Sequence, residues 1–327
     1  MNVDKYAHTT MTAIDSAGSG FGANSWLVEE MYEQFRSDPG SVSETWREFF
    51  SDYKPAIAPI AVAPVSAAAS LSNGAAPTVA HADSQAVPEE LGEPIRGAGA
   101  AIAANMERSL SVPTATSFRT IPAKLLEVNR KVINGYRSRS GQGKVSFTHL
   151  IGFAVVRAIA DAVPNMGNSY VAGADGKPRV IHNPAVNMGL AVDVDKGDGT
   201  RTLVVPVLRS ADTLDFGGFL AAYEDLIRKV KSNKLAVSDF QGATITLTNP
   251  GTIGTVQSVP RLMPGQGVIV GVGTIDYPAE FQGADERALG SLGVSKIVTI
   301  TSTYDHRIIQ GAESGMFLKR VHELLLG

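Results

Sequence analysis

A histidine near the C-terminus is the most informative chemical feature of this chain. The β-forming run Lys296–Tyr304 is followed at once by Asp305, His306 and Arg307. Imidazole is the side chain that titrates near neutral pH without perturbation, so His306 is the first candidate for a general base. Its place after an apolar strand supports this role, because the ends of rigid elements often carry function. The alternative is an ordinary surface histidine beside an aspartate.

A second set of polar groups follows another predicted strand, at Thr248 and Asn249 and in the turn Pro250–Gly254. A hydroxyl, an amide and a glycine-containing backbone are donors that an oxyanion needs, provided that they face a cleft. The alternative is a polar strand exit shaped by Pro250 and Gly251. The turn lacks the lysine of a phosphate-binding loop, and no dinucleotide-binding fingerprint occurs.

Composition narrows the class of protein. The chain has 327 residues and no cysteine, which excludes disulfides, thiolate metal sites and a cysteine nucleophile. None of its six histidines has a partner at metal-ligand spacing, so no metal site is expected. A net charge of −3 gives no reason to expect binding to nucleic acid or to an anionic membrane. Without a membrane-spanning apolar run or a secretory leader, we expect a cytoplasmic protein.

The elements that must position these residues lie within 95–327. Apolar periodicity predicts helices over 146–163, 216–230 and 313–326, and strands over 186–194, 202–208, 243–248, 267–275 and 296–304. We also expect a helix that starts at Thr120, with Pro122 in its first turn. Helices and strands mix without regular βαβ alternation, which indicates an α/β (α+β) domain with a mixed sheet. His149 falls in the buried helix 146–163, where we expect a structural role.

Three regions precede this domain: a disordered tail (1–20), a helical segment (21–53) and an Ala/Pro-rich linker (54–94). The helical segment contains both tryptophans, Trp26 and Trp46. Its two short helices cannot bury that aromatic surface against each other alone. They therefore either pack on the main domain or dock on another protein. We favour docking, because the linker cannot bury enough apolar surface to fold and resembles a tether.

Residues 95–327 resemble the acyltransferase component of 2-oxoacid dehydrogenase complexes. The matching segments are Val112-Pro113, Phe147–His149, Pro164–Met166, Val186–Asp193, Leu203–Leu208, Lys234-Leu235, Thr244–Thr255 and Asp305–Gly311. The whole chain resembles the N-terminal part of the fused actinobacterial 2-oxoglutarate dehydrogenase. The segments that carry this second likeness are Trp26–Glu30, the Ala/Pro linker, Val112–Thr116, Leu247–Thr255, Val259–Leu262 and Tyr277–Gly283.

The resemblance implies a chloramphenicol-acetyltransferase-like fold, built as a homotrimer with active sites between subunits. It implies transfer of a succinyl group from dihydrolipoyl-lysine to coenzyme A, within the 2-oxoglutarate dehydrogenase complex of the tricarboxylic acid cycle. His306 matches the general base and Thr248 the hydroxyl that stabilises the oxyanion, with Asn249 its neighbour. Gln310 stands where the wider family has an aspartate. The chemistry agrees, because a thiol with a pKa of about 8.5 needs a base to attack a thioester at neutral pH.

The resemblance also implies the protein partners and the cofactors of the chain. No lipoyl domain precedes the catalytic region, so the lipoyl group should arrive on another acyltransferase subunit of the 2-oxoglutarate and pyruvate dehydrogenase complexes. Thiamine diphosphate and Mg²⁺ belong only to domains expected after Gly327, and we expect the chain to be a fragment of a multifunctional enzyme. Two alternatives stay open: a non-catalytic trimeric scaffold for the thiamine-dependent dehydrogenase, and a small-molecule acetyltransferase.

Overall fold

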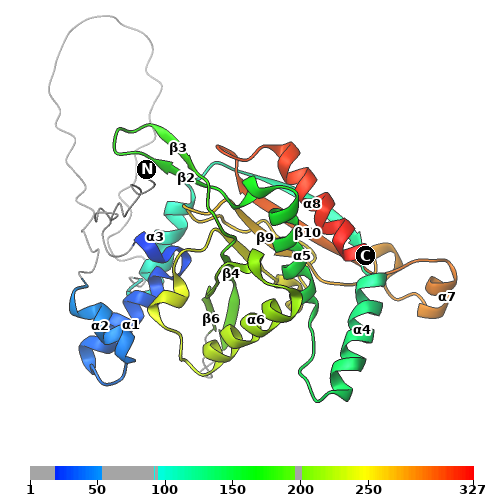
Figure 1. Ribbon diagram of the computed structural model, residues 1–327, viewed down its shortest axis with the longest axis horizontal. Coiled ribbons are helices and arrows are strands. Elements are labelled where there is room, and N and C mark those ends of the chain that lie inside the picture. Colours follow the sequence, from blue (N-terminus) through cyan, green and yellow to red (C-terminus); the bar gives the residue numbers. More distant parts are fainter. Residues whose placement is uncertain (1–18, 54–91, 93–94, 196–200) are drawn as a thin grey trace, which may run out of the picture.

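A six-stranded mixed sheet lies at the centre of the protein (Figure 1). The structure is a computed structural model that describes residues 19–53, 92, 95–195 and 201–327. The strand order is β1-β10-β9-β8-β4-β7. The strands are β1 (Thr114–Pro122), β4 (Met188–Leu190), β7 (Val207–Leu208), β8 (Ile245–Thr248), β9 (Val268–Val272) and β10 (Ile297–Asp305). Strands β4, β8 and β9 run parallel, whereas β1, β10 and β7 pair antiparallel with their neighbours.

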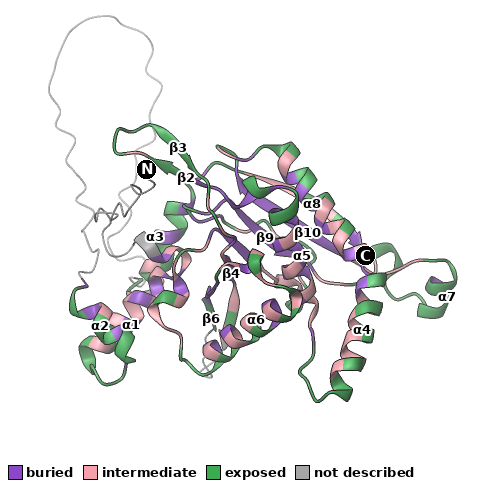
Figure 2. Cartoon of the chain, viewed as in Figure 1, coloured by how far each residue is buried: buried purple, intermediate pink, exposed green. Residues whose placement is uncertain are grey.

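Helices α5 (Phe147–Asp161), α6 (Phe216–Lys231) and α8 (Gly311–Leu326) supply much of the main hydrophobic core against this sheet (Figures 1 and 2). Helix α5 is apolar nearly all round, as its burial requires. The remaining elements are α3 (Gly97–Ser109), α4 (Lys124–Arg139), α7 (Glu286–Ser291), the hairpin of β2 (Ser169–Ala172) and β3 (Pro178–Ile181), and the pair β5 (Val192–Asp195) and β6 (Arg201–Val204).

Threonines line the other face of the sheet. Thr116 and Thr303 share a hydrogen bond of 2.9 Å across β1 and β10. The loop 255–266 passes close to this face, and a Cβ on Gly273 would lie 1.9 Å from the carbonyl oxygen of Val256. Only glycine permits so close a backbone approach. The loop therefore packs directly on the strand that neighbours Thr248.

The predicted mixed sheet and the helices at 146–163, 216–230 and 313–326 are confirmed. The predicted helix start at Thr120 is wrong, because residues 114–122 form the edge strand β1 and α4 begins at Lys124. Proline is tolerated at the end of an edge strand, so Pro122 marks a strand end here. The predicted strands 186–194 and 202–208 each divide into two shorter strands.

The N-terminal helices α1 (Ser25–Ser37) and α2 (Glu44–Ser51) pack on the main domain. Their buried aromatic residues join Val204, Val230 and Phe240 in a second hydrophobic cluster. The preferred prediction, docking of 21–53 on another protein, is therefore corrected in favour of the alternative. The complementary apolar surface comes from β6, α6 and the turn before β8, which the local pattern of 21–53 does not reveal. Residues 1–18 of the predicted tail, and all of the predicted linker except Gly92, lie outside the described residues.

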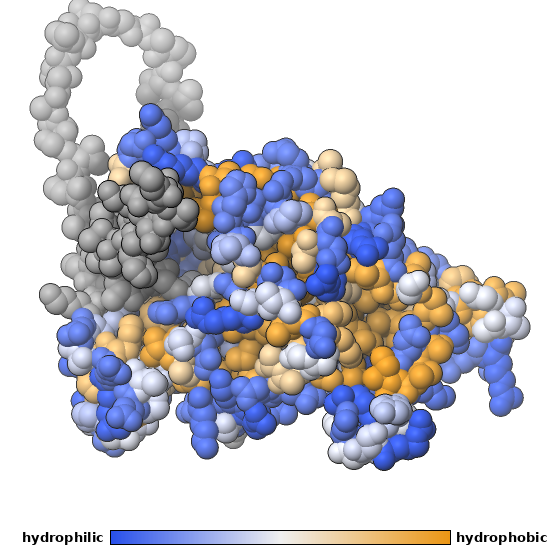
Figure 3. All heavy atoms as spheres, viewed as in Figure 1, coloured by the Kyte–Doolittle hydropathy of each residue, from blue (hydrophilic) through white to orange (hydrophobic). Residues whose placement is uncertain are grey.

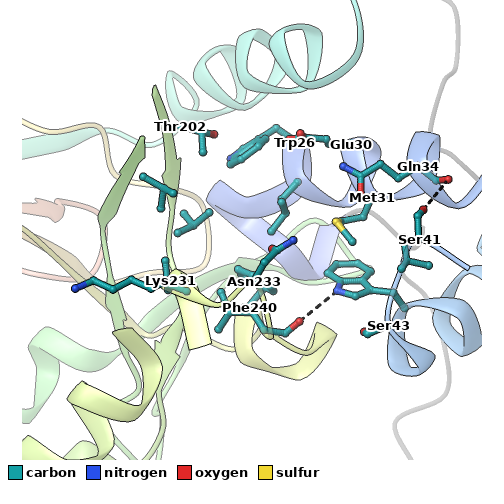
Figure 4. Close-up of a pocket in the computed structure, with 17 residues that line it drawn as sticks. Trp26, Glu30, Met31, Gln34, Ser41, Ser43, Thr202, Lys231, Asn233 and Phe240 are labelled. Carbon is teal, nitrogen blue, oxygen red and sulfur yellow. Dashed lines mark hydrogen bonds between the residues drawn. The ribbon is translucent and has the colours of Figure 1, made fainter. Parts of the chain in front are cut away.

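A cavity of about 540 Å³ remains at this junction. In Figure 4, Trp26 and Met31 of α1 lie across it from Phe240. The indole of Trp46 donates a hydrogen bond of 3.3 Å to the carbonyl oxygen of Leu235. The helical segment is thus held on the main domain by apolar contacts and by a specific hydrogen bond.

Asn24 is the main polar anchor of the helical segment. Its side chain is 3% exposed. Its Oδ1 accepts from the backbone N–H of Val205 at 2.8 Å, and its Nδ2 donates to the carbonyl oxygens of Val205 at 2.9 Å and Phe240 at 3.3 Å. Asn24 therefore satisfies the backbone of Val205 at the break between β6 and β7.

Replacing Asn24 by alanine is expected to destabilise the protein by about 2 kcal/mol, because it leaves buried backbone groups without partners. Urea unfolding measures this effect. The matched control is Ser37→Ala, which removes exposed hydrogen bonds at the end of α1 and is expected to stay within about 0.5 kcal/mol of wild type. An Asn24→Ala midpoint equal to that of the control would contradict the anchor role.

Candidate active site

His306 lies directly after β10, where two backbone contacts fix its position. Its backbone N–H donates to the carbonyl oxygen of Pro113 at 2.9 Å, and its Nδ1 lies 3.1 Å from the carbonyl oxygen of Ile309. Because a carbonyl oxygen can only accept, Nδ1 carries the proton in this contact. In the neutral ring this leaves the lone pair on Nε2, as a general base requires.

The neighbouring aspartate is committed to a different partner. Asp305 is 2% exposed, and its carboxylate accepts from Nε and Nη2 of Arg307 at 2.8 and 2.6 Å. The hydrogen bond with Asp305 raises the pKa of Arg307, and the guanidinium also lies 3.6 Å from the centre of the Tyr170 ring. This bidentate ion pair makes the turn from Asp305 to Arg307 rigid.

Gln310 lies four residues beyond His306, at the N-cap of α8. Its backbone N–H donates to Oε2 of Glu313 at 2.7 Å, and Oε1 of Glu313 accepts from Asn165 at 2.7 Å. The side chain of Gln310 is exposed. Glu313 therefore places a carboxylate near this position, and that carboxylate is already hydrogen-bonded.

Thr248 ends β8, and the next residue, Asn249, lines a cavity of about 300 Å³. The Nδ2 of Asn249 donates to the hydroxyl of Thr148 at 2.7 Å. Thr148, Asn249, Thr252, Thr274 and Arg130 are among the lining residues. Of the predicted hydroxyl–amide pair, the amide of Asn249 belongs to a residue that lines this cavity, whereas Thr248 is not among the lining residues. The sequence reasoning did not single out Thr148 or Arg130, although Thr148 stands in a segment that carries the family resemblance.

The two predicted parts of the site lie at opposite ends of the sheet. The backbone N–H of Asp305 donates to Gly267, whose N–H donates to Thr244, both at 3.0 Å. Thr248 is four residues further along β8, which corresponds to about 13 Å at ~3.3 Å per residue. Two strand spacings of about 4.8 Å add to that separation. One chain therefore does not bring His306 and Thr248 together.

His149 has the structural role that its position suggests. Its Nδ1 accepts from the backbone N–H of Ser146 at 3.2 Å, and its ring packs edge-on against Tyr223. Burial lowers the pKa of His149, while the charge of Glu224 partly opposes that effect and Arg137 adds to it. A neutral imidazole is required for Nδ1 to accept this bond.

This lowered pKa predicts a pH-dependent contribution to stability. The unfolded chain, with a histidine pKa of about 6.5, binds the proton more readily than the folded protein. The contribution is therefore complete above that pH and is lost as the pH falls toward the lower folded pKa. His149→Gln, which retains an acceptor, is expected to reduce the acid-side fall in urea midpoint. An unchanged fall in the variant would contradict the assignment.

Two kinds of feature, a metal-binding cluster and a membrane-spanning helix, are both absent from the described part of the chain. Within residues 19–53, 92, 95–195 and 201–327, no cluster of three histidine, aspartate or glutamate side chains is arranged to hold a metal ion. No helix in those ranges has the length and apolar character needed to cross a membrane.

Solved structures place this fold among acyltransferase catalytic cores. The cubic core of the pyruvate dehydrogenase multienzyme complex matches with a TM-score of 0.59 and 26% identity, over 76% of this chain and 97% of that one. A probable dihydrolipoamide acetyltransferase from Listeria monocytogenes also gives 0.59, with 24% identity over 73% of this chain and 95% of that one. The predicted fold class is confirmed.

The family follows from the sequence models. Residues 88–326 match the 2-oxoacid dehydrogenases acyltransferase (catalytic domain), and residues 20–56 match the 2-oxoglutarate dehydrogenase N-terminus. The chain belongs to the 2-oxoacid dehydrogenase acyltransferase family.

Curated relatives support the second resemblance as well. A multifunctional 2-oxoglutarate metabolism enzyme from Mycolicibacterium vanbaalenii is 49% identical, over 94% of this chain and 28% of its own length. One from Mycobacterium sp. (strain KMS) is 46% identical, over 96% of this chain and 30% of its own length. The chain therefore spans less than a third of these relatives.

Proposed function

We propose that this chain transfers a succinyl group from dihydrolipoyl-lysine to coenzyme A in a 2-oxoglutarate dehydrogenase complex. The observation that carries the proposal is the imidazole of His306, whose Nδ1 is held by Ile309 at the end of a rigid strand. The relatives' name refers to 2-oxoglutarate metabolism, and oxidative decarboxylation of 2-oxoglutarate yields a succinyl group. Both support succinyl as the acyl group.

In the proposed mechanism, Nε2 of His306 removes the proton from the thiol of coenzyme A. The thiolate sulfur attacks the thioester carbonyl carbon, and the Thr248 hydroxyl donates to the resulting oxyanion. Collapse of this intermediate breaks the bond to the dihydrolipoyl sulfur, which takes the proton back from His306. Asn249 is the neighbour of Thr248 on the side of the site that donates to the oxyanion. Gln310 contributes a neutral amide near the base, so it offers hydrogen bonding without a charge.

We assign the complete site to two copies of the chain. The separation of His306 from Thr248 supports this, because the proposed mechanism needs both around one thioester. Helix α4 also exposes apolar side chains that self-association would cover; these are Leu125, Val128, Val132 and Tyr136. Figure 3 shows hydrophobic side chains exposed on the face that carries α4. The family resemblance makes the proposed assembly a homotrimer.

The proposed substrates and partners follow from the same site. Coenzyme A is polyanionic, and Arg130 supplies a cation to the cavity beside Asn249. The lipoyl group is proposed to arrive on a lipoyl-bearing acyltransferase subunit of the 2-oxoglutarate or pyruvate dehydrogenase complexes. Thiamine diphosphate and Mg²⁺ are assigned to the part of the relatives that lies beyond this chain, and the proposed compartment is the cytoplasm.

The test is an assay of the full chain with coenzyme A and either succinyl- or acetyl-dihydrolipoamide. We expect succinyl-CoA to form with the higher kcat/KM. A folded oligomer that neither binds coenzyme A nor transfers an acyl group would instead favour the scaffold alternative. Acetyl transfer from acetyl-CoA to a small hydroxyl compound, without transfer to or from dihydrolipoamide, would favour the small-molecule acetyltransferase.

A further inference from the structure

The first turn of α5 forms a wall of the cavity that Asn249, the residue after the proposed oxyanion donor, also lines. Ser146, Phe147 and Thr148 all line that cavity. A reciprocal cap fixes the turn: the backbone N–H of His149 donates to the Ser146 hydroxyl, and the N–H of Ser146 donates to Nδ1 of His149, both at 3.2 Å. Such a capping box satisfies two helix-terminal donors at once. The position of Thr148 is therefore set by its neighbours on both sides.

A cation adds to the rigidity of this wall. The guanidinium of Arg130 lies 4.3 Å from the centre of the Phe147 ring, and its Nε donates to the carbonyl oxygen of Val145 at 3.0 Å. The contact joins α4 to the start of α5. Thr148 thus projects from a turn that is held by its cap and by α4.

The Thr148 hydroxyl is the side-chain partner of Asn249. It accepts from Nδ2 at 2.7 Å, while the Asn249 carbonyl oxygen accepts from the Thr252 hydroxyl at 3.1 Å. The backbone of Asn249, with φ −126° and ψ 73°, lies outside the helical and extended regions. Contacts at both its amide and its backbone therefore hold Asn249 in an unusual conformation, one peptide bond from Thr248.

We propose that Thr148 is a positioning residue for acyl transfer. Its hydroxyl uses one hydrogen of the Asn249 amide, and so aims the second hydrogen and Oδ1 into the cavity toward bound substrate. Through the same residue it holds the end of β8, from which the Thr248 hydroxyl meets the oxyanion. The proposal rests on the proposed function and adds to it a residue on a different element.

Thr148→Val keeps the shape of the side chain and removes the acceptor. We expect kcat for succinyl transfer to fall about tenfold, the loss typical of one positioning hydrogen bond, with KM for both substrates nearly unchanged. Thr148→Ser retains the hydroxyl and is expected to restore kcat to within about threefold of wild type. The matched control is Thr213→Val, which removes an exposed hydroxyl–carbonyl bond elsewhere and should leave kcat unchanged.

A double-mutant cycle with Asn249→Ala separates positioning from a general structural effect. If Thr148 acts through Asn249, Thr148→Val should reduce kcat little further in the Asn249→Ala background. Independent, multiplicative losses would overturn the proposal, as would a Thr148→Val enzyme with wild-type kcat. Failure of the function itself has a different signature: a folded wild-type protein without succinyl transfer refutes both the function and the role of Thr148. If the wild-type protein transfers succinyl but Thr148→Val leaves kcat unchanged, only the role of Thr148 is refuted.

Discussion

Replacing His306 by alanine is expected to lower kcat for succinyl-CoA formation by roughly 100- to 10,000-fold, the range of a general-base contribution. The thiol of coenzyme A would then have to lose its proton to water, since Asp305 is fully engaged by Arg307. The side chain of His306 is exposed, so its loss creates no cavity and should leave the fold intact. Steady-state assays at saturating coenzyme A measure the effect.

His182→Ala is the matched control, because His182 is also an exposed histidine outside the helices and strands. It should retain wild-type kcat, and size-exclusion chromatography should give the same assembly for both variants. A His306→Ala protein with undiminished turnover and unchanged assembly would remove His306 from the mechanism.

The sequence reveals the two parts of the proposed site more clearly than it reveals the residues that hold them in place. His306 follows an apolar strand and Thr248 ends one, and a strand exit is a local signal. Thr148 has no such signal, because its proposed role depends on a contact with Asn249 across 101 residues of chain. Asn24 meets Val205 across 181 residues. Contacts at such separations are set by tertiary packing, which neither periodicity nor turn chemistry encodes.

The same distinction explains the errors in the fold. The sequence predicts a helix start at Thr120 because Pro122 favours a helix start as well as a strand end, and pairing with β10 decides between them. The sequence of the helical segment 21–53 favours docking on another protein because its aromatic stripe must be buried against some apolar surface. The chain supplies that surface with Val204, Val230 and Phe240. Amphipathic pattern identifies a face that must be buried, but not the surface that buries it.

Two inactive variants are expected to restore activity when they assemble together. Thr248→Ala alone should lower kcat by roughly 100- to 1,000-fold, as the loss of an oxyanion donor does. If each site takes His306 from one copy and Thr248 from the next, a mixed ring contains sites in which both residues are native. Random assembly of equal amounts makes about one site in four intact in a closed symmetric trimer. Co-expression of the two variants should therefore recover about a quarter of wild-type turnover.

This recovery tests the geometry directly, because a site built within one chain would carry one defect in every copy and would stay inactive. The two chains are given different affinity tags, so that mixed assemblies can be purified before assay. Each mixed trimer has one intact site in three, so the purified mixed assemblies should show about a third of wild-type turnover. Co-expression of two differently tagged His306→Ala chains is the control and should recover nothing. Mixed assemblies with no recovery would refute a site shared between copies. The separation of His306 and Thr248 along the sheet would then require a rearrangement within the chain before transfer.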